Sequence, residues 1–343
     1  MKLPAMQWIL QAGLYLSSLI KCKGGVQMKA ILKKYINGLP DDSALLRIIL
    51  FFYKKAYNIY FCFVRRTRRL SDYIDTVRGI KPVLDYLEVQ IADHCNLKCK
   101  GCGHFSNIVD GEVFFDIKQY EKEIQRLSEL FRNIRKIRIM GGEPLLNDRF
   151  TEYVEITRKA FPDAEVHVAT NGLTLMNISA EAIEILRKND VEIHVSLYRP
   201  LLQNLARIED FLKTHSLKYD ITRTKKFVKA FNPEGTSNPK TMVKSCLAKD
   251  CTFLSPGYIS RCSMPYCIRY FNQRFKYSIA TNDMINIYDT GITGAKLKAM
   301  FRKPLEICGY CAIPQWVEWE RGTGTSAKIT DWSAVSLISS EGA

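Results

Sequence analysis

The chain has 343 residues, 47% of them hydrophobic and 25% charged, and its formal net charge is +15. This composition is typical of a globular protein and excludes a chain that is disordered throughout. Residues 1–70 contain 13 Lys and Arg against 2 Asp and Glu, so most of the net charge belongs to that segment. The charge therefore does not indicate a nucleic-acid substrate.

The N-terminal extension, residues 1–80, is apolar and basic. Residues 3–20 carry no charge, and their 18 positions are near the lower limit for a segment that spans a bilayer. Residues 43–64 predict a helix with Arg47 and Lys54 on one face and aromatic side chains over most of the rest. Such a helix is typical of contact with an anionic membrane surface. Packing against the rest of the chain or a partner chain is the alternative.

From residue 81 onward the sequence alternates between strand and helix patterns. The predicted strands are 85–92, 135–140, 164–170, 191–197 and 217–222, with a sixth near 226–231. The predicted helices are 117–133, 148–161, 179–189 and 201–214. Alternation of this kind predicts a parallel sheet whose strands are joined by right-handed helical crossovers.

Three cysteines follow the first predicted strand: Cys95, Cys99 and Cys102, with the spacing C-x3-C-x2-C. Three thiolates from one loop can bind three corners of a cubane iron–sulfur cluster, which usually takes four cysteines. A missing fourth ligand leaves one iron open, and an open position is typical of catalytic metal sites. The alternative is a structural zinc site with His94 or His104 as its fourth ligand.

A second motif, Gly141-Gly142-Glu143-Pro144, follows the second predicted strand. Together with the cysteine loop it resembles the radical S-adenosylmethionine (radical SAM) enzymes, whereas a zinc site does not predict such a turn. The resemblance implies that the three cysteines bind a [4Fe-4S] cluster, that its open iron binds the methionine end of SAM, and that the turn contacts the SAM amine. Glycines allow the backbone to approach a ligand closely, and Glu143 offers a carboxylate to an ammonium group.

The resemblance also implies an α/β fold, a partial (β/α)6 TIM-like barrel over residues 81–235, with ligands at the carboxyl ends of the strands. Asn171 and Ser196, at the ends of the third and fourth predicted strands, are then candidate SAM contacts. Asn171 before a glycine also fits a simple turn. Many family members have an aromatic residue directly before the third cysteine, where this chain has Gly101. The adenine contact would then come from elsewhere; Phe105 is one possibility, or else a core residue.

A second group of cysteines lies near the C-terminus. The predicted ligands are Cys246, Cys262, Cys308 and Cys311. Their spacing around Gly257 resembles the twitch or SPASM-like extensions of radical SAM enzymes, which implies an auxiliary [4Fe-4S] cluster in a domain of residues 236–325, followed by a tail, 326–343. Cys251 is an alternative to Cys246, and Cys267 is a spare thiol or a further ligand. A structural zinc ribbon is the alternative for the whole group.

The family resemblance implies reductive cleavage of SAM and abstraction of a hydrogen atom from a substrate carbon. An auxiliary cluster with four cysteine ligands would take up an electron, which makes the net reaction a two-electron oxidation. The cysteine spacing is similar to that of twitch-bearing aminocyclitol dehydrogenases, so we expect an oxidoreductase acting on an alcohol of a sugar, cyclitol or related metabolite. The alternatives are a peptide-modifying maturase, a cyclase acting on a purine nucleotide, and a non-catalytic iron–sulfur or zinc-binding protein.

Partners and location follow from the same resemblance. The expected reductant is a flavodoxin or a ferredoxin, and no nucleic-acid partner is expected. Cysteines grouped in metal-ligand patterns favour a reducing cytoplasm over a secreted disulfide framework. Peripheral membrane contact would involve residues 1–70.

Overall fold

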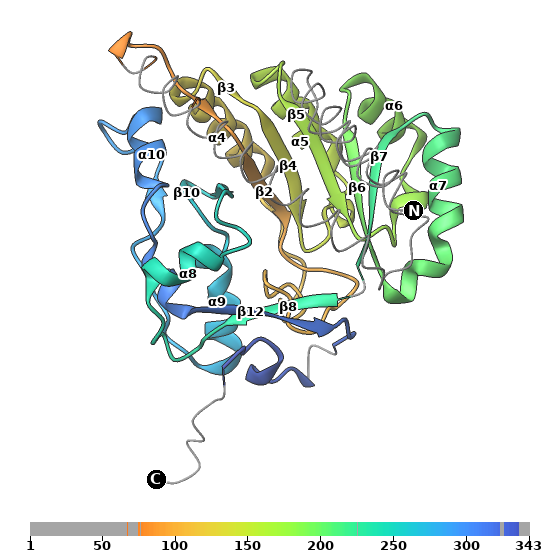
Figure 1. The fold of residues 1–343 in the computed structure, drawn as a ribbon. Coiled ribbons are helices and arrows are strands. Elements are labelled where there is room, and N and C mark those ends of the chain that lie inside the picture. Colours follow the sequence, from red (N-terminus) through yellow and green to blue (C-terminus); the bar gives the residue numbers. More distant parts are fainter. Residues whose placement is uncertain (1–66, 68–74, 76, 225, 323–325, 336–343) are drawn as a thin grey trace, which may run out of the picture. The chain divides into compact units, whose positions relative to one another are not determined.

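The computed structural model describes residues 67, 75, 77–224, 226–322 and 326–335. The chain divides into two units, Met1–Ser71 and Asp72–Ala343, and the second contains the fold in Figure 1. The predictions for residues 3–20 and 43–64 lie outside the described residues. Within the described part of the chain, no helix is long and apolar enough to cross a membrane.

The second unit is an α/β structure around one large sheet. Its strands lie in the order β11 (Ile285–Asn286), β10 (Tyr258–Ser260), β9 (Phe253–Ser255), β2 (Leu87–Ala92), β4 (Lys136–Gly141), β5 (Glu165–Thr170), β6 (Glu192–Tyr198) and β7 (Lys218–Thr224). Neighbouring strands from β9 to β7 are parallel. The connecting helices are α4 (Ile117–Leu130), α5 (Phe150–Ala160), α6 (Ala180–Lys188) and α7 (Leu205–Thr214). The predicted parallel α/β alternation is confirmed and is consistent with a partial barrel.

The prediction of a sixth barrel strand near 226–231 is wrong in its pairing. These residues form a strand, β8 (Lys226–Phe231), but it pairs antiparallel with β12 (Cys311–Glu318) in a separate two-stranded sheet. The reason is the length of the connection, because β7 ends at Thr224 and a parallel neighbour needs a crossover of about a dozen residues. The sixth parallel strand is β9, which lies beside β2.

The two faces of the parallel sheet differ in polarity. Alternate residues on one face are buried and apolar, among them Val89, Ile139 and Val168. The other face is polar, because the register places Glu88 beside Arg138 and Arg138 beside His167. Successive side chains of a strand point to opposite faces, so the apolar set packs in the core and the polar set lines the opposite side.

The remaining elements lie at both ends of the sheet. They are β1 (Val83–Leu84), which pairs with β3 (Asn133–Ile134), and the helices α8 (Pro239–Ser245), α9 (Met264–Phe275) and α10 (Gly294–Met300). Of these, β1, β3 and α10 lie at the amino end. Figure 1 shows β8 and β12 below the end of the sheet to which the β5 arrow points. A second hydrophobic core lies here, with Phe105, Phe271 and Trp332 among its buried members.

Glu123 of α4 contacts the turn between β9 and β10. Its side chain is fully buried, and its Oε1 accepts hydrogen bonds from the Gly257 backbone N–H and from Gln119 Nε2. Its Oε2 has no hydrogen-bond partner among the described residues. Burial raises the pKa of the Glu123 carboxyl to about 7. The helix and the turn are therefore joined through a carboxyl group that holds its proton more tightly in the folded protein than in the unfolded chain.

This arrangement predicts a pH-dependent contribution of Glu123 to stability. Because the folded-state pKa is raised, the contribution is favourable at low pH and is lost as the pH rises from about 5 through 7. Relative to Glu123→Gln, the wild type should lose roughly 2–3 kcal/mol of unfolding free energy between about pH 5 and pH 8, measured by urea unfolding. Glu121→Gln, an exposed carboxylate of the same helix, is the control. Parallel pH profiles for the wild type and Glu123→Gln would contradict the expectation.

Candidate functional site

The first cysteine loop directly follows β2. Cys99 is buried, and Cys95 and Cys102 are half-buried. The pKa of Cys95 is raised to about 11 and that of Cys99 to about 12, chiefly by burial and in part by the nearby Cys102. The three thiols thus lie close enough for their charges to interact, in a place where thiolates are costly without a cation. This donor set fits a bound metal cluster, since a coordinating metal supplies the positive charge that deprotonates its thiols.

The Gly-Gly-Glu-Pro turn packs against the segment that leads into this loop. The Gly142 N–H donates to the Ala92 carbonyl at 2.7 Å, and the Glu143 N–H donates to the His94 carbonyl at 3.1 Å. A Cβ on Gly141 would lie 2.1 Å from the Ala92 carbonyl oxygen, and one on Gly142 would lie 2.1 Å from that of His94. The close approach made possible by these glycines is therefore an approach to the protein backbone that leads into the first cysteine.

Glu143 ties the end of β4 to the end of β5. Its carboxylate is fully buried and accepts hydrogen bonds from Thr170 Oγ1 at 2.7 Å, the Asn171 N–H at 2.8 Å and the Leu145 N–H at 3.1 Å. Burial raises its pKa to about 7, while these three donors oppose the rise. Pro144 begins the short helix η1 (Pro144–Leu146). The contact of Glu143 with an ammonium group stays a prediction.

Asn171 lies against the cysteine loop. Its Nδ2 donates to Asn96 Oδ1 at 2.8 Å and approaches Cys95 Sγ at 3.7 Å, while its Oδ1 accepts from the Leu173 N–H at 2.9 Å. The residue therefore forms both the expected turn and a link to the first thiol. Ser196 lies in β6, in register with Thr222 of β7 and on the same face as Tyr198.

Tyr198 is a site residue that the sequence did not single out. Burial raises the pKa of the Tyr198 phenol, and the nearby Cys99, Cys102 and Cys95 add to the rise. Its ring centroid lies 5.8 Å from that of Trp319. The available signal was its position two residues beyond Ser196, which places both side chains on one face of the strand end.

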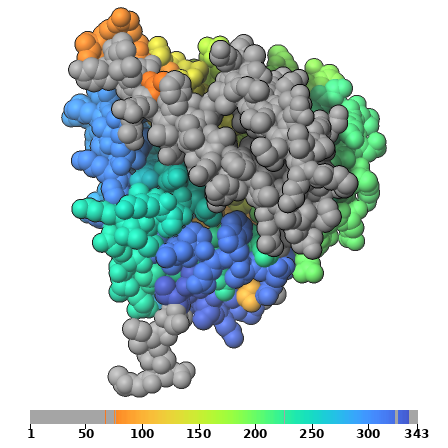
Figure 2. Space-filling view, in the orientation of Figure 1, coloured from red at the N-terminus to blue at the C-terminus, as the bar shows by residue number. Residues whose placement is uncertain are grey.

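The segment that follows β12 pairs with the cysteine loop. Trp319 Nε1 donates to Cys99 Sγ at 3.2 Å, the Lys100 N–H donates to the Glu320 carbonyl at 3.0 Å, and Cys99 forms an antiparallel bridge with Arg321. In Figure 2 a small light-orange patch, the colour of residues near 100, lies among the blue C-terminal residues. The first cysteine loop is thus covered by a segment more than 200 residues away in sequence.

A second C-terminal contact explains why glycine stands before the third cysteine. Trp332 Nε1 donates to the Cys102 carbonyl at 2.8 Å. Gly101 has φ +69°, and a Cβ there would lie 2.3 Å from the Asp331 carbonyl oxygen. An aromatic side chain at this position is therefore excluded by the backbone of the C-terminal segment.

Phe105, the candidate adenine contact, is a core residue. It is fully buried, and its ring centroid lies 5.9 Å from that of Phe231, 5.5 Å from that of Phe271 and 5.6 Å from that of Trp332. Of the two expectations for Phe105, the core residue is therefore the one that the structure bears out, because these aromatic neighbours enclose its ring.

The second group of cysteines is also brought together. Cys246 ends α8, Cys262 follows β10, and Cys308 and Cys311 lie where η4 (Glu306–Tyr310) meets β12. The pKa of Cys262 is raised to about 12 by burial, with further contributions from Cys246 and Cys308. Burial also raises the pKa of Cys311, and the other three thiols add to the effect.

Two further cysteines near this group differ from each other. Burial raises the pKa of Cys251, and the nearby Glu88, Cys262 and Cys246 add to the rise. Cys267 is fully buried, and its thiol donates to Gln90 Oε1 at 3.7 Å. Cys251 is therefore placed to act as an alternative ligand, whereas Cys267 has a partner of its own in the core. Gly257, with φ +78°, forms the tight turn between β9 and β10.

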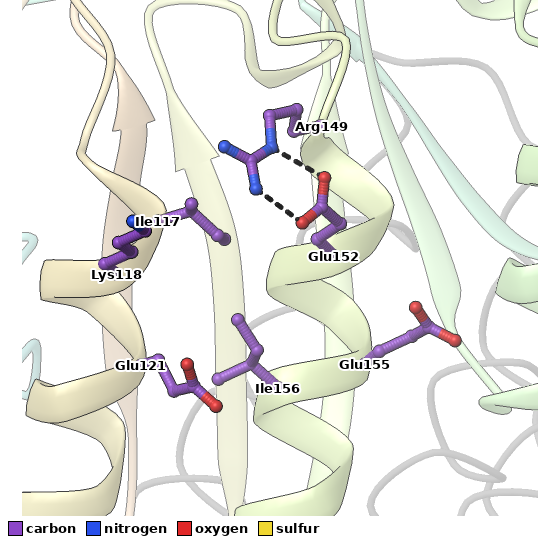
Figure 3. A pocket seen from close by; sticks show the side chains of 7 residues that line it. All are labelled: Ile117, Lys118, Glu121, Arg149, Glu152, Glu155 and Ile156. Carbon is purple, nitrogen blue, oxygen red and sulfur yellow. Dashed lines mark hydrogen bonds and ion pairs between the residues drawn. The ribbon is translucent and has the colours of Figure 1, made fainter.

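A surface hollow between α4 and α5 contains none of the predicted site residues. Figure 3 shows it lined by Ile117, Lys118, Glu121, Arg149, Glu152, Glu155 and Ile156. The Arg149 guanidinium forms two hydrogen bonds with the Glu152 carboxylate, at 2.6 and 2.7 Å. Because the hollow contains this local ion pair and none of the predicted site residues, the cysteine-bearing edge of the sheet is the stronger candidate.

A parallel α/β sheet with a three-thiol loop at its carboxyl edge is the arrangement expected of a protein that binds a metal cofactor at that edge. Residues 89–232 match the model of the Radical SAM superfamily. The match covers less than half of the chain, and the family that it describes implies a [4Fe-4S] cluster and SAM as cofactors. The matched range includes both motifs, Asn171 and Ser196, and it ends before the second cysteine group.

The curated relatives match the chain over part of their length. The GTP 3',8-cyclase of Thermodesulfovibrio yellowstonii is 33% identical over 100 residues, 29% of this chain and 31% of the relative. The GTP 3',8-cyclase of Helicobacter pylori is 26% identical over 153 residues, 40% of this chain and 46% of the relative. The chain thus spans less than half of these relatives.

Two solved structures are similar to parts of this chain. BtrN in complex with AdoMet and 2-DOIA is 17% identical with a TM-score of 0.43, covering 68% of this chain and 94% of that chain. Streptococcus suis SuiB bound to S-adenosylmethionine is 11% identical with a TM-score of 0.37, covering 84% of this chain and 81% of that chain.

Proposed function

We propose that this protein is a radical SAM oxidoreductase that oxidises an alcohol of a sugar, cyclitol or related metabolite. The observation that supports the radical SAM chemistry best is the contact between the cysteine loop and the Gly-Gly-Glu-Pro turn at the carboxyl edge of the sheet. When bound to Cys95, Cys99 and Cys102, a [4Fe-4S] cluster supplies the low-potential electron that cleaves SAM and gives the hydrogen-abstracting radical.

The protein's own residues would bind and orient the reactants. The Gly141–Pro144 turn, Asn171 and Ser196 are the proposed SAM contacts. Asn171 is supported by its position 3.7 Å from Cys95 Sγ, and the turn by its backbone bonds to the segment before that cysteine. Trp319 and Trp332 cover two cysteines of the loop, which limits access of water to the site.

The proposal that the substrate is oxidised depends on the second cysteine group. The proposed auxiliary-cluster ligands are Cys246, Cys262, Cys308 and Cys311, with Cys251 as the alternative to Cys246. Four thiolate ligands leave no open iron for substrate, which favours electron uptake from a substrate radical as the role of this cluster. These residues would form a twitch or SPASM-like domain of residues 236–325.

Other radical SAM reactions are the alternatives. The relatives named GTP 3',8-cyclase support shared cofactor chemistry over the matched region. A purine nucleotide and a peptide are the alternative substrates for this chain, and the substrate panel described below tests both. The same proposal includes a flavodoxin or ferredoxin as reductant, a cytoplasmic location, and contact of residues 1–70 with a membrane surface.

The test is anaerobic reconstitution of the full chain, followed by iron counts and an assay for 5'-deoxyadenosine with dithionite and SAM. We expect about eight irons in the wild type and about four in Cys95→Ala/Cys99→Ala/Cys102→Ala, because only one four-iron cluster is lost. Cys267→Ala, a buried cysteine outside both groups, should keep about eight. The triple variant should form no 5'-deoxyadenosine.

Substrate class is tested with the same holoenzyme and a panel of cyclitols, sugars, GTP and short peptides. Formation of one ketone per SAM consumed would support alcohol oxidation. Turnover of GTP or a peptide alone would replace the proposed substrate while keeping the radical chemistry. Zinc in place of iron, with no SAM cleavage, would reject the enzyme proposal.

A further inference from the structure

Two histidines and a glutamate meet on the polar face of the sheet, away from both cysteine groups in sequence. His167 Nδ1 lies 2.6 Å from His194 Nε2, and Glu192 Oε1 lies 3.2 Å from the same His194 nitrogen. One ligand atom from each of the three residues lies within 4.8 Å of the others. We propose that His167, His194 and Glu192 bind a divalent transition-metal ion of the zinc class.

The strand register produces this cluster. His167 of β5 is the direct neighbour of Glu192 in β6, and His194 follows two residues later on the same face. All three side chains therefore leave adjacent parallel strands in the same direction. Their positions are fixed by paired backbone and not by a loop. The two imidazoles are hydrogen-bonded to each other, and a bound metal ion would replace that hydrogen bond.

The chemistry of the donors fits zinc. Two imidazole nitrogens and one carboxylate oxygen are a common set of protein ligands for catalytic zinc, with the fourth position left to water or substrate. Magnesium and calcium prefer sites made of oxygen atoms, so the two imidazoles disfavour them. The donors contain no sulfur, which separates this site from the cysteine groups by ligand type.

The surroundings supply a second carboxylate and a path of entry. Glu165 Oε2 lies 3.8 Å from His167 Nε2, the nitrogen turned away from His194, where a carboxylate typically orients a metal-binding histidine. The His167 side chain is 4% exposed, whereas those of His194 and Glu192 are 25% and 37% exposed. The proposed site is thus closed on one side and open to solvent on the other. Lys136 lies 3.4 Å from Glu165 and offsets part of its charge.

The experiment measures zinc bound to the full chain after its cysteine groups have been loaded with iron and sulfide. The protein is equilibrated with zinc sulfate and desalted, and zinc and iron per chain are measured by mass spectrometry. We expect about one zinc in the wild type and at least a 100-fold weaker affinity in His194→Asn and Glu192→Gln, because each lacks a ligand. Glu165→Gln should weaken binding about 10–100-fold.

His215→Asn is the matched control, because His215 lies at the end of α7 beside Phe211 and outside the cluster. It should bind zinc as the wild type does. X-ray absorption at the zinc edge should show only nitrogen and oxygen at about 2.0 Å, without sulfur at about 2.3 Å. Equal zinc in the wild type and in His194→Asn, or sulfur in the zinc shell, would overturn the proposal. An unchanged iron count in the variants separates this result from any failure of the radical SAM proposal.

Discussion

Replacing Gly142 with alanine is expected to abolish iron–sulfur binding at the first cysteine loop. The new Cβ would lie 2.1 Å from the His94 carbonyl oxygen, 2.5 Å from its carbonyl carbon and 2.8 Å from the Asp93 carbonyl oxygen. All three are backbone atoms just before Cys95, so no side-chain rotation can relieve the overlap. Overpacking typically costs about 1–3 kcal/mol, and a clash with backbone belongs at the upper end. The turn and the loop would have to separate.

The measurement is iron per chain after reconstitution, together with 5'-deoxyadenosine formation. Gly142→Ala should lose about four irons and all SAM cleavage, while the second cysteine group keeps its metal. Gly103→Ala is the control within the cysteine loop itself, because a Cβ there meets nothing within 4 Å. It should behave as the wild type. A Gly142→Ala protein with full iron content would show that the turn is not needed to shape the loop.

The sequence predicted the radical SAM domain well because its signals are local. The alternation of strands and helices follows hydrophobic patterns, and both motifs lie directly after strands that the patterns predict. The pairing of β8 was predicted wrongly, although the short connection after Thr224 contained the information needed to avoid the error. Whether a segment forms a helix or a strand therefore follows from the pattern of neighbouring residues. Which strands pair also depends on the length of the connection between them.

The contacts of the C-terminal segment could not be predicted in this way. Trp319 lies 220 positions after Cys99, and Trp332 lies 230 positions after Cys102. No periodicity or spacing rule links residues so distant. Gly101 shows the same limit, because its departure from the family pattern has a cause only in the position of Asp331. The carboxylate of Glu143 likewise has protein donors that the motif alone does not specify.

Replacing Trp319 with alanine is expected to destabilise the described unit and expose the first cysteine loop. The side chain is only 7% exposed, packs beside Tyr198 and donates its N–H to Cys99 Sγ at 3.2 Å. Truncation of a buried tryptophan typically costs about 3–5 kcal/mol. Trp316→Ala is the matched control on the same segment, because Trp316 is 61% exposed. It should change the unfolding free energy by no more than about 0.5 kcal/mol.

Trp319→Phe separates the hydrogen bond from the packing. Phenylalanine keeps most of the buried ring but has no N–H, so the sulfur of Cys99 loses a donor worth about 1 kcal/mol. Hydrogen bonds to ligand sulfur stabilise the reduced, more negative state of an iron–sulfur cluster. The reconstituted Trp319→Phe protein should therefore show a reduction potential lower by about 40 mV for a one-electron couple, measured by potentiometric titration. Trp316→Phe should leave the potential unchanged, and an equal shift in both variants would mean that the Trp319 N–H does not tune the cluster.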